Sequence, residues 1–164
     1  MKSFRFFSLL LGCVALASCD KNRVFDNYKS IEDKGWHKDS VVHFQLPILD
    51  SLKQYQLFFN IRNTNDFKYS NLFLITAIEF PNGKNEVDTL EYKLAEPDGT
   101  WLGQGFSTLK ENKLWFKENF KFSENGAYKI KLRHAMRTNG KVNGIVYLKG
   151  ISDVGFRIET SETD

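Results

Sequence analysis

The sequence predicts an all-β protein, a single antiparallel β-sandwich of immunoglobulin-like size with about seven or eight strands. Three observations lead to this prediction. Apolar and polar residues alternate with a period of two in several segments, turn residues separate those segments, and few stretches show a helical period. The composition agrees with this fold, because aromatic residues make up 15% of the chain and are enough to build a core.

The N-terminus has the layout of a lipoprotein signal peptide. Lys2 and Arg5 form a basic start, and residues 6–16 are almost wholly apolar. This run is shorter than the about 20 residues that span a bilayer. It ends in Leu16-Ala17-Ser18-Cys19, the pattern that a lipoprotein signal peptidase cleaves before the cysteine. We therefore expect residues 1–18 to be removed and Cys19 to be acylated; the alternative is an ordinary secretory signal that contains a cysteine by chance.

Acylation of Cys19 would make membrane lipid a permanent partner. Each buried acyl CH₂ contributes about 0.8 kcal/mol, so two or more acyl chains hold a protein firmly. We therefore expect a lipid-anchored protein of the cell envelope, with the outer membrane as its location. Asp20, which follows the cysteine, leaves the choice of membrane open by itself, because bacterial groups sort lipoproteins by different rules.

Cleavage would leave a nearly neutral domain without a disulfide. Removing 18 of the 164 residues leaves 146, which suits one domain. Lys2 and Arg5 leave with the signal peptide, so 21 basic and 20 acidic residues remain. No long run of like charge exists, and we expect no nucleic-acid partner. Cys13 is also removed and Cys19 carries lipid, so the core must provide the stability.

The remaining chain divides into a lead-in and a domain. Residues 19–38 are predicted to be a lipidated tether or irregular lead-in, and residues 39–164 the β-sandwich. Apolar residues occur throughout the lead-in, which suggests that part of it packs back on the domain. Residues 41–46 and 154–159 are predicted to form the first and last strands.

Most of the predicted strands have one polar face. Strict alternation of apolar and polar residues predicts such strands at residues 55–61, 90–94, 114–122 and 128–132. Residues 72–80 are apolar on both parities, which predicts a central strand covered on both faces. A single helical turn is expected at residues 109–113. Pro81-Asn82-Gly83 and Pro97-Asp98-Gly99 provide tight turns between strands.

Eight segments of the chain, in order, resemble the gliding-motility lipoprotein family GldH of the Bacteroidota. They are Phe25-Asp26-Asn27-Tyr28 and residues 59–63, 69–74, 80–83, 88–92, 97–103, 134–137 and 153–159. The resemblance implies an envelope lipoprotein that is needed for gliding, in a machinery intertwined with the type IX secretion system. Other gliding and secretion envelope proteins are therefore expected partners. Only the acylated cysteine, here Cys19, carries over as a functional position.

The sequence gives no sign of catalysis. His37, His43 and His134 lack the spacing of zinc ligands, and no Gly-x-Ser-x-Gly motif occurs. Glycines 99, 103 and 105 are not followed by the Lys-Ser/Thr pair of a phosphate-binding loop. We expect no enzyme, no catalytic residue, no cofactor and no metal.

Residue type and position select candidates for contact with a partner protein. Exposed tryptophans and arginines are common at protein interfaces. Arginine suits such contacts because its planar guanidinium makes two hydrogen bonds at once. The candidates are Arg62, Tyr69, Trp101, Trp115, Arg133, His134 and Arg137. For His134 the alternative is a locally hydrogen-bonded core histidine, since it shares its parity with Ile130 and Leu132. For the tryptophans the alternative is packing against a neighbouring loop or sheet.

Two functions fit these observations. The leading hypothesis is a non-catalytic interaction module of the gliding and type IX secretion apparatus. The alternative is a carbohydrate-binding lipoprotein for glycan capture, in which Trp36, Trp101 and Trp115 form a sugar-stacking platform. Sugar binding predicts two coplanar exposed rings in a groove, whereas protein docking predicts a flatter apolar patch with an arginine rim.

Overall fold

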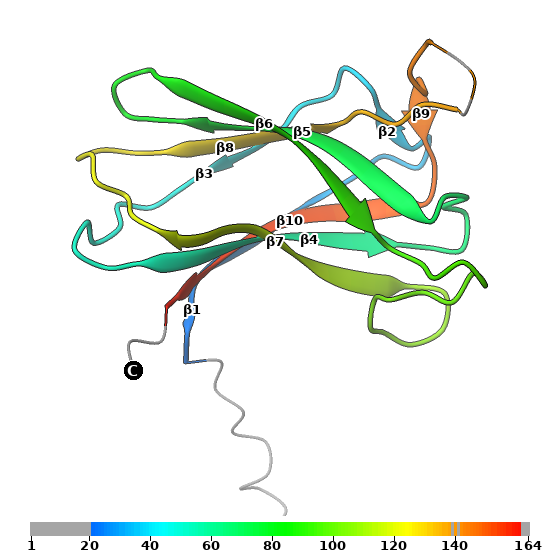
Figure 1. Cartoon of the computed structure of the whole chain (residues 1–164), viewed down its shortest axis with the longest axis horizontal. Helices are drawn as coiled ribbons and strands as arrows, with labels where there is room; N and C mark the ends of the chain where they lie inside the picture. Colours follow the sequence, from blue (N-terminus) through cyan, green and yellow to red (C-terminus); the bar gives the residue numbers. More distant parts are fainter. Residues whose placement is uncertain (1–20, 139, 141, 162–164) are drawn as a thin grey trace, which may run out of the picture.

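The computed structural model describes residues 21–138, 140 and 142–161. Two four-stranded antiparallel sheets face each other, and a two-stranded ribbon lies at one end (Figure 1). The strand order is β1-β10-β4-β7 in the first sheet and β3-β8-β5-β6 in the second. The described residues form no helix. The predicted all-β sandwich is confirmed.

The described part of the chain contains ten strands, and two of these are only two residues long. Their bounds are β1 (Arg23–Ser30), β2 (Trp36–His37), β3 (Val42–Gln45), β4 (Tyr55–Asn63), β5 (Asn71–Glu79), β6 (Asn85–Lys93), β7 (Lys110–Phe120), β8 (Lys129–His134), β9 (Tyr147–Leu148) and β10 (Ile151–Thr160). The strands predicted from alternation all occur, with ends shifted by a few residues.

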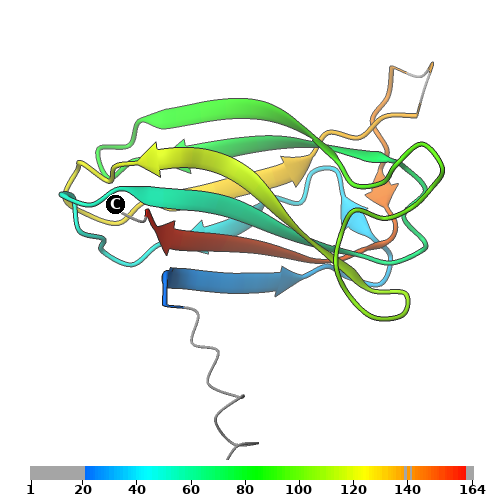
Figure 2. The same ribbon diagram turned by 60° about the horizontal axis from the view of Figure 1, so that its bottom comes forward.

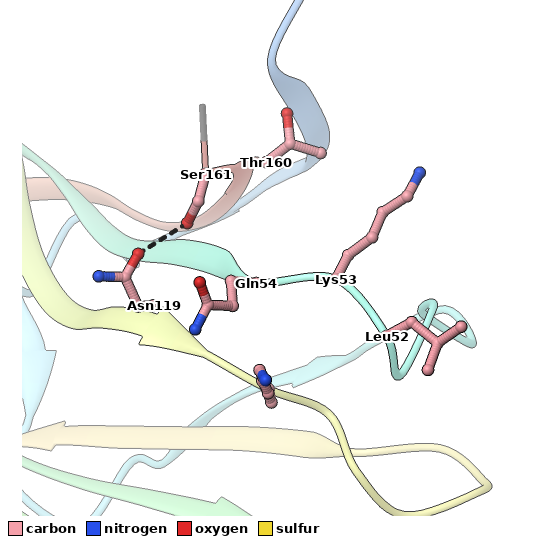
Figure 3. A pocket seen from close by; sticks show the side chains of 7 residues that line it. Leu52, Lys53, Gln54, Asn119, Thr160 and Ser161 are labelled. Carbon is pink, nitrogen blue, oxygen red and sulfur yellow. Dashed lines mark hydrogen bonds between the residues drawn. The ribbon is translucent and has the colours of Figure 1, made fainter. Parts of the chain in front are cut away.

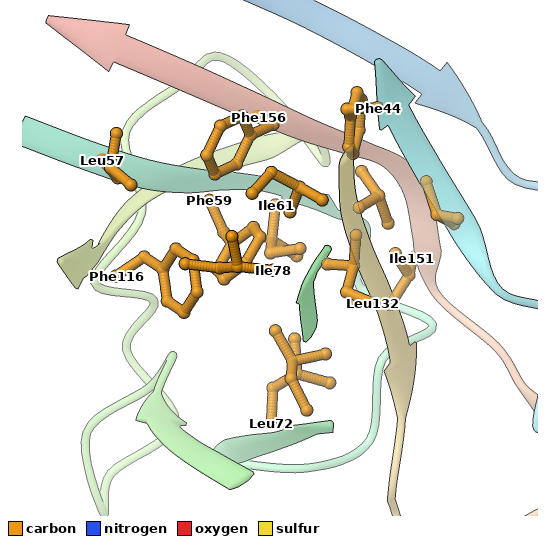
Figure 4. Close-up of a cluster of buried hydrophobic side chains, with 14 of the residues drawn as sticks. Phe44, Leu57, Phe59, Ile61, Leu72, Ile78, Phe116, Leu132, Ile151 and Phe156 are labelled. Atoms are coloured by element: carbon orange, nitrogen blue, oxygen red, sulfur yellow. The ribbon is translucent and has the colours of Figure 1, made fainter. Parts of the chain in front are cut away.

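The core forms where the inward residues of the two sheets meet (Figure 4). Phe156 of β10 lies at its centre, with its ring centroid 5.5 Å from that of Phe59 and 6.0 Å from that of Phe44 across the sandwich. Fully burying one such side chain stabilises the fold by about 1.5–3 kcal/mol. The buried residues come from alternate positions of each strand, as Ile130 and Leu132 of β8 illustrate.

Residues 72–80 differ from the prediction in one respect. They form β5, which lies between β8 and β6, but only one of its faces is fully buried. Phe73, Ile75 and Ala77 point outward and stay half-exposed. The strand with buried residues on both faces is β4, because neighbouring side chains of the first sheet cover its outward residues.

Two other segments are more regular than the sequence suggested. Residues 23–30 of the predicted lead-in form β1, which pairs with β10 along its whole length, and Phe25 packs against the core. The predicted helical turn at residues 109–113 is wrong, since β7 begins at Lys110. Edge pairing decides both cases, and the partner strands β10 and β4 are distant in sequence.

One end of the sandwich collects the start of the described chain and its end. The backbone N–H of Thr160 donates to the carbonyl of Asn22 at 2.9 Å, and that of Ser161 donates to Gln54 at 3.0 Å. Figure 2 shows β1 beginning and β10 ending at this end. We call it the anchor end. It also holds the loops at residues 46–54 and 121–128, which connect the two sheets.

Candidate interaction surface

The outer face of the first sheet is covered by its own side chains. Tyr28 of β1 lies over Gly155 of β10, its partner in the register, so closely that a Cβ on Gly155 would lie 2.8 Å from the ring. The guanidinium of Arg62 stacks on the Tyr28 ring with Cζ 4.1 Å from its centroid. Arg62 Nε also donates to Glu111 at 2.6 Å. These contacts fix Arg62 within the face.

Hydrogen bonds extend this cover towards β4. The hydroxyl of Tyr28 donates to Glu111 at 3.1 Å and accepts from the side-chain amide of Asn60 at 2.9 Å. Burial, together with the nearby carboxylates of Glu111 and Asp26, raises the pKa of Tyr28 to about 12. Tyr28 therefore stays neutral and keeps donating at any physiological pH.

The other half of the same face is sealed around Phe58. Its ring centroid lies 4.4 Å from that of Trp115, and Lys113 Nζ lies 4.1 Å above the ring. Phe58 is consequently only 3% exposed, although it points away from the core. Lys113 also pairs with Glu159 at 2.7 Å. Trp115, half-exposed itself, acts here as a lid on Phe58.

The outer face of the second sheet lacks such a cover. Phe73, Ile75 and Ala77 of β5 form a line along its middle, and Val87 of β6 lies beside Ala77 in the register. We call these four residues the apolar row. Val87 is 61% exposed. Because directly opposed residues on one face are cross-strand neighbours, the four side chains make a continuous apolar strip.

Basic side chains of β8 border the apolar row. Arg133 is paired with Ile75 and Lys131 with Ala77. Lys131 and Lys129 both bind Glu79 at one end of the strip, and these hydrogen bonds lower the pKa of the Glu79 carboxyl to about 2. Arg133, in contrast, makes no ion pair within the described part of the chain. Its guanidinium is available to a carboxylate of another molecule.

A groove continues the apolar row at its other end. Its lining includes Phe73, Ile75 and Tyr69, and also Arg137 from the segment that follows β8. Met136 closes its floor, accepting the backbone N–H of Phe73 on its sulfur at 3.3 Å. Arg137 is exposed and unpaired among the described residues. The apolar row, the groove, Arg133 and Arg137 form one surface. It is an apolar strip with an arginine rim.

Comparison with known proteins identifies the family of this chain. The family model described as "GldH lipoprotein" matches residues 23–158. The chain belongs to the GldH lipoprotein family. The "Gliding motility lipoprotein GldH homolog" of Christiangramia forsetii is 56% identical over 98% of both chains. The "Gliding motility lipoprotein GldH" of Flavobacterium johnsoniae is 55% identical, covering 94% of this chain and 95% of its own.

Solved structures add little for this GldH family member. The VP2 subviral particle protein of infectious bursal disease virus matches 83% of this chain and 30% of its own, with 12% identity and a TM-score of 0.34. A likeness this low carries no argument. No helix in the described part of the chain is long and apolar enough to cross a membrane.

The structure distributes six of the seven candidate contact residues over three places on the surface. Arg62 and Trp115 belong to the covered face of the first sheet, and Tyr69, Arg133 and Arg137 to the open face of the second. Trp101 packs on a loop: its Nε1 donates to Asn65 at 3.2 Å, and its ring lies 6.3 Å from that of Phe67. The three tryptophans form no common platform, because Trp36 is buried in the core.

His134 lies in the interior of this GldH family member. It is 1% exposed, its Nε2 lies 2.9 Å from the carbonyl of Trp36, and its Nδ1 accepts the backbone N–H of Met136 at 3.4 Å. These partners put the ring hydrogen on Nε2, and burial lowers the pKa of the imidazole. His134 is therefore a locally hydrogen-bonded core histidine and not a surface contact residue. Its side chain does not reach the surface.

The apolar row itself was missed by sequence reasoning. Residues 72–80 carry part of the signal, since they are apolar on both parities, but this pattern predicts a strand that is covered on both faces. The described residues contain no group of three or more possible metal ligands. Cys19 and the predicted cleavage site lie outside the described residues, so acylation stays a prediction.

Proposed function

We propose that this GldH family member acts in gliding motility as a membrane-anchored, non-catalytic interaction module of the gliding and type IX secretion apparatus. It docks to another envelope protein through the outer face of the second sheet. One observation carries the proposal: the apolar row and its unpaired arginines are uncovered, whereas the equivalent face of the first sheet is sealed. The names of the relatives, which are gliding motility lipoproteins, support the cellular role.

The chemistry of the surface suits a protein partner. An apolar centre provides affinity by losing contact with water, and arginines at the rim provide bidentate hydrogen bonds to carboxylates. Arg133 and Arg137 lie on one side of the strip, so the partner should present carboxylates there. The sugar-binding alternative loses support, because its tryptophan platform is not formed.

The proposal also includes the lipid on Cys19, with the outer membrane as its location. A Cys19→Ala variant should stay folded but leave the membrane, because the proposed acyl chains are its main attachment and the described residues contain no helix long and apolar enough to replace them. Fractionation of envelopes measures this directly. A variant that still fractionates with the acylated pool would disprove the anchor.

In-cell cross-linking tests the docking surface. Cells that lack the native protein would carry either the wild type or a Val87→Asp/Arg137→Glu variant. This variant places a charge on the apolar row and reverses the sign of one charge at its arginine rim. The matched control is Val24→Asp/Lys29→Glu, the same chemistry at exposed positions of β1. Cross-linked partners are identified by mass spectrometry of the envelope fraction, and colony spreading measures gliding.

The expected result is loss of spreading and of the cross-linked gliding or secretion proteins in the Val87/Arg137 variant alone. Both variants should accumulate to wild-type levels. If the Val87/Arg137 variant keeps its partners, the docking face is elsewhere. If the wild type captures only glycan importers, the carbohydrate hypothesis replaces this one.

A further inference from the structure

We infer that the anchor end of the sandwich lies against the lipid bilayer, with Ile48 and Leu52 inserted among the headgroups. The inference rests on the proposed acylation of Cys19 and adds a second, non-covalent contact with the same membrane. Its partner is a lipid surface, not a protein. The domain would then have a defined orientation on the membrane.

The length of the tether comes first. Only Asp20 and Lys21 separate Cys19 from Asn22, whose carbonyl is bonded to Thr160 at the end of β10. Three residue steps span at most about 11 Å. An acylated Cys19 sits at the membrane interface, so this short tether keeps the anchor end next to the headgroups.

The loop at residues 46–54 lies beside the point where the tether enters. Ser161, next to Thr160, donates its backbone N–H to Gln54 at 3.0 Å and its hydroxyl to Asn119 at 3.0 Å (Figure 3). Strands β1 and β4 are separated only by β10, which places them about 10 Å apart. The loop is therefore within reach of the same patch of membrane.

Two apolar side chains project from this loop into solvent. Ile48 is 82% exposed and Leu52 is 89% exposed, while Leu49 between them packs towards the core. Figure 3 shows Leu52 at the tip, pointing away from the sheets. Single exposed apolar side chains are common, but Ile48 and Leu52 lie on one loop at the anchor end and together offer apolar surface to a membrane.

The loop holds this conformation by its own hydrogen bonds. The carboxylate of Asp50 accepts the N–H of Leu52 at 2.9 Å, and the hydroxyl of buried Tyr55 accepts the N–H of Asp50 at 3.2 Å. Ile48 and Leu52 are thus presented before any membrane is met, and insertion requires little ordering of the backbone.

Charge contributes little to this contact. Lys53 and Lys121 line the hollow beside Leu52, but Asp50 lies in the same loop and Glu162 and Asp164 follow in the sequence. The signs nearly balance, so insertion of the apolar side chains is expected to drive binding on neutral lipid as well. This distinguishes the contact from attraction to an anionic surface.

Lipid-borne quenchers test the orientation. Acylated protein with Leu52→Cys or Phe106→Cys carries an environment-sensitive fluorophore and is reconstituted in phosphatidylcholine vesicles with headgroup nitroxide. Phe106 is the matched control, since it is 95% exposed but lies at the opposite end, about 30 Å away over the nine residues of β4. The thiol of Cys19 is occupied by lipid and takes no label.

Quenching should be at least threefold stronger at position 52 than at position 106. A label at Ser51 in an Ile48→Asp/Leu52→Asp variant should lose most of the quenching that the same label shows with the native loop. Equal quenching at positions 52 and 106 in protein of verified acylated mass would overturn this inference alone. An N-terminal peptide without lipid would overturn the proposed anchor as well.

Discussion

The outer faces of the two sheets differ in how their apolar side chains are shielded from water. In the first sheet, Arg62 stacks on Tyr28 and Trp115 packs on Phe58, so that even the outward-pointing Phe58 is buried. In the second sheet, Phe73, Ile75 and Ala77 of β5 also point outward, but β6 and β8 provide no aromatic lid over them. The difference shows that the exposure of a hydrophobic strand depends on its neighbours. The uncovered face is the one that we propose for docking.

The largest difference is expected between two matched phenylalanines. Phe58→Ala should lower the free energy of unfolding by about 3 kcal/mol, because it empties a sealed site beneath Trp115. Phe73→Ala, on the open face, should cost about 1–2 kcal/mol, since part of that ring is already exposed. Urea denaturation followed by tryptophan fluorescence measures both. Equal losses would remove the contrast between the faces.

Gly155 tests how the cover of the first sheet is built. Gly155→Ala should destabilise the fold by about 1–3 kcal/mol, because the new methyl group would displace the Tyr28 ring and loosen its bonds to Arg62 and Asn60. Gly144→Ala is the control, since its Cβ would meet nothing closer than an ordinary contact of 3.5 Å. If both variants unfold at the same urea concentration, the close stacking is not required.

The interior behind the open face should respond to acid. Burial lowers the pKa of His134, so its imidazole binds a proton more weakly in the folded chain than in the unfolded chain. The stabilising contribution is present above the ordinary histidine pKa of about 6.5 and is lost as the pH falls towards the lower folded value. The slope cannot exceed about 1.4 kcal/mol per pH unit for one proton.

A His134→Gln variant provides the comparison. Glutamine can keep a hydrogen bond to Trp36 without titrating, so its stability should change less than that of the wild type between pH 7.5 and pH 5.5. Urea unfolding curves of both proteins at both pH values measure this change in the free energy of unfolding. An identical acid sensitivity in the two proteins would assign the effect to other groups.

The smallest expected change separates stability from binding. Val87→Thr alters an exposed position of the apolar row and should shift the free energy of unfolding by less than about 0.5 kcal/mol. Partner capture in cells should still fall, since the row loses apolar surface. Val24→Thr on β1 serves as the control and should leave capture unchanged.

Local pattern predicted the fold well and the surface poorly. Alternation at residues 55–61 and 128–132 predicted β4 and β8, and the parity of His134 already matched that of its buried neighbours. The burial of Phe58 could not be predicted, because its cover comes from β7, which is distant in sequence. For the same reason residues 23–30 resembled an irregular lead-in: their strand exists only through pairing with β10.

The pairing of β1 also has a mechanical consequence. Under the proposed anchoring, a pull on the lipid would run along the axis of β1, because the tether leaves from its first residues. Seven residue pairs with β10, from Arg23 to Ser30, would then resist in shear and would have to give way together. A strand peeled from its side would open one pair at a time. The membrane is thus attached in the direction in which the sheet withstands tension best.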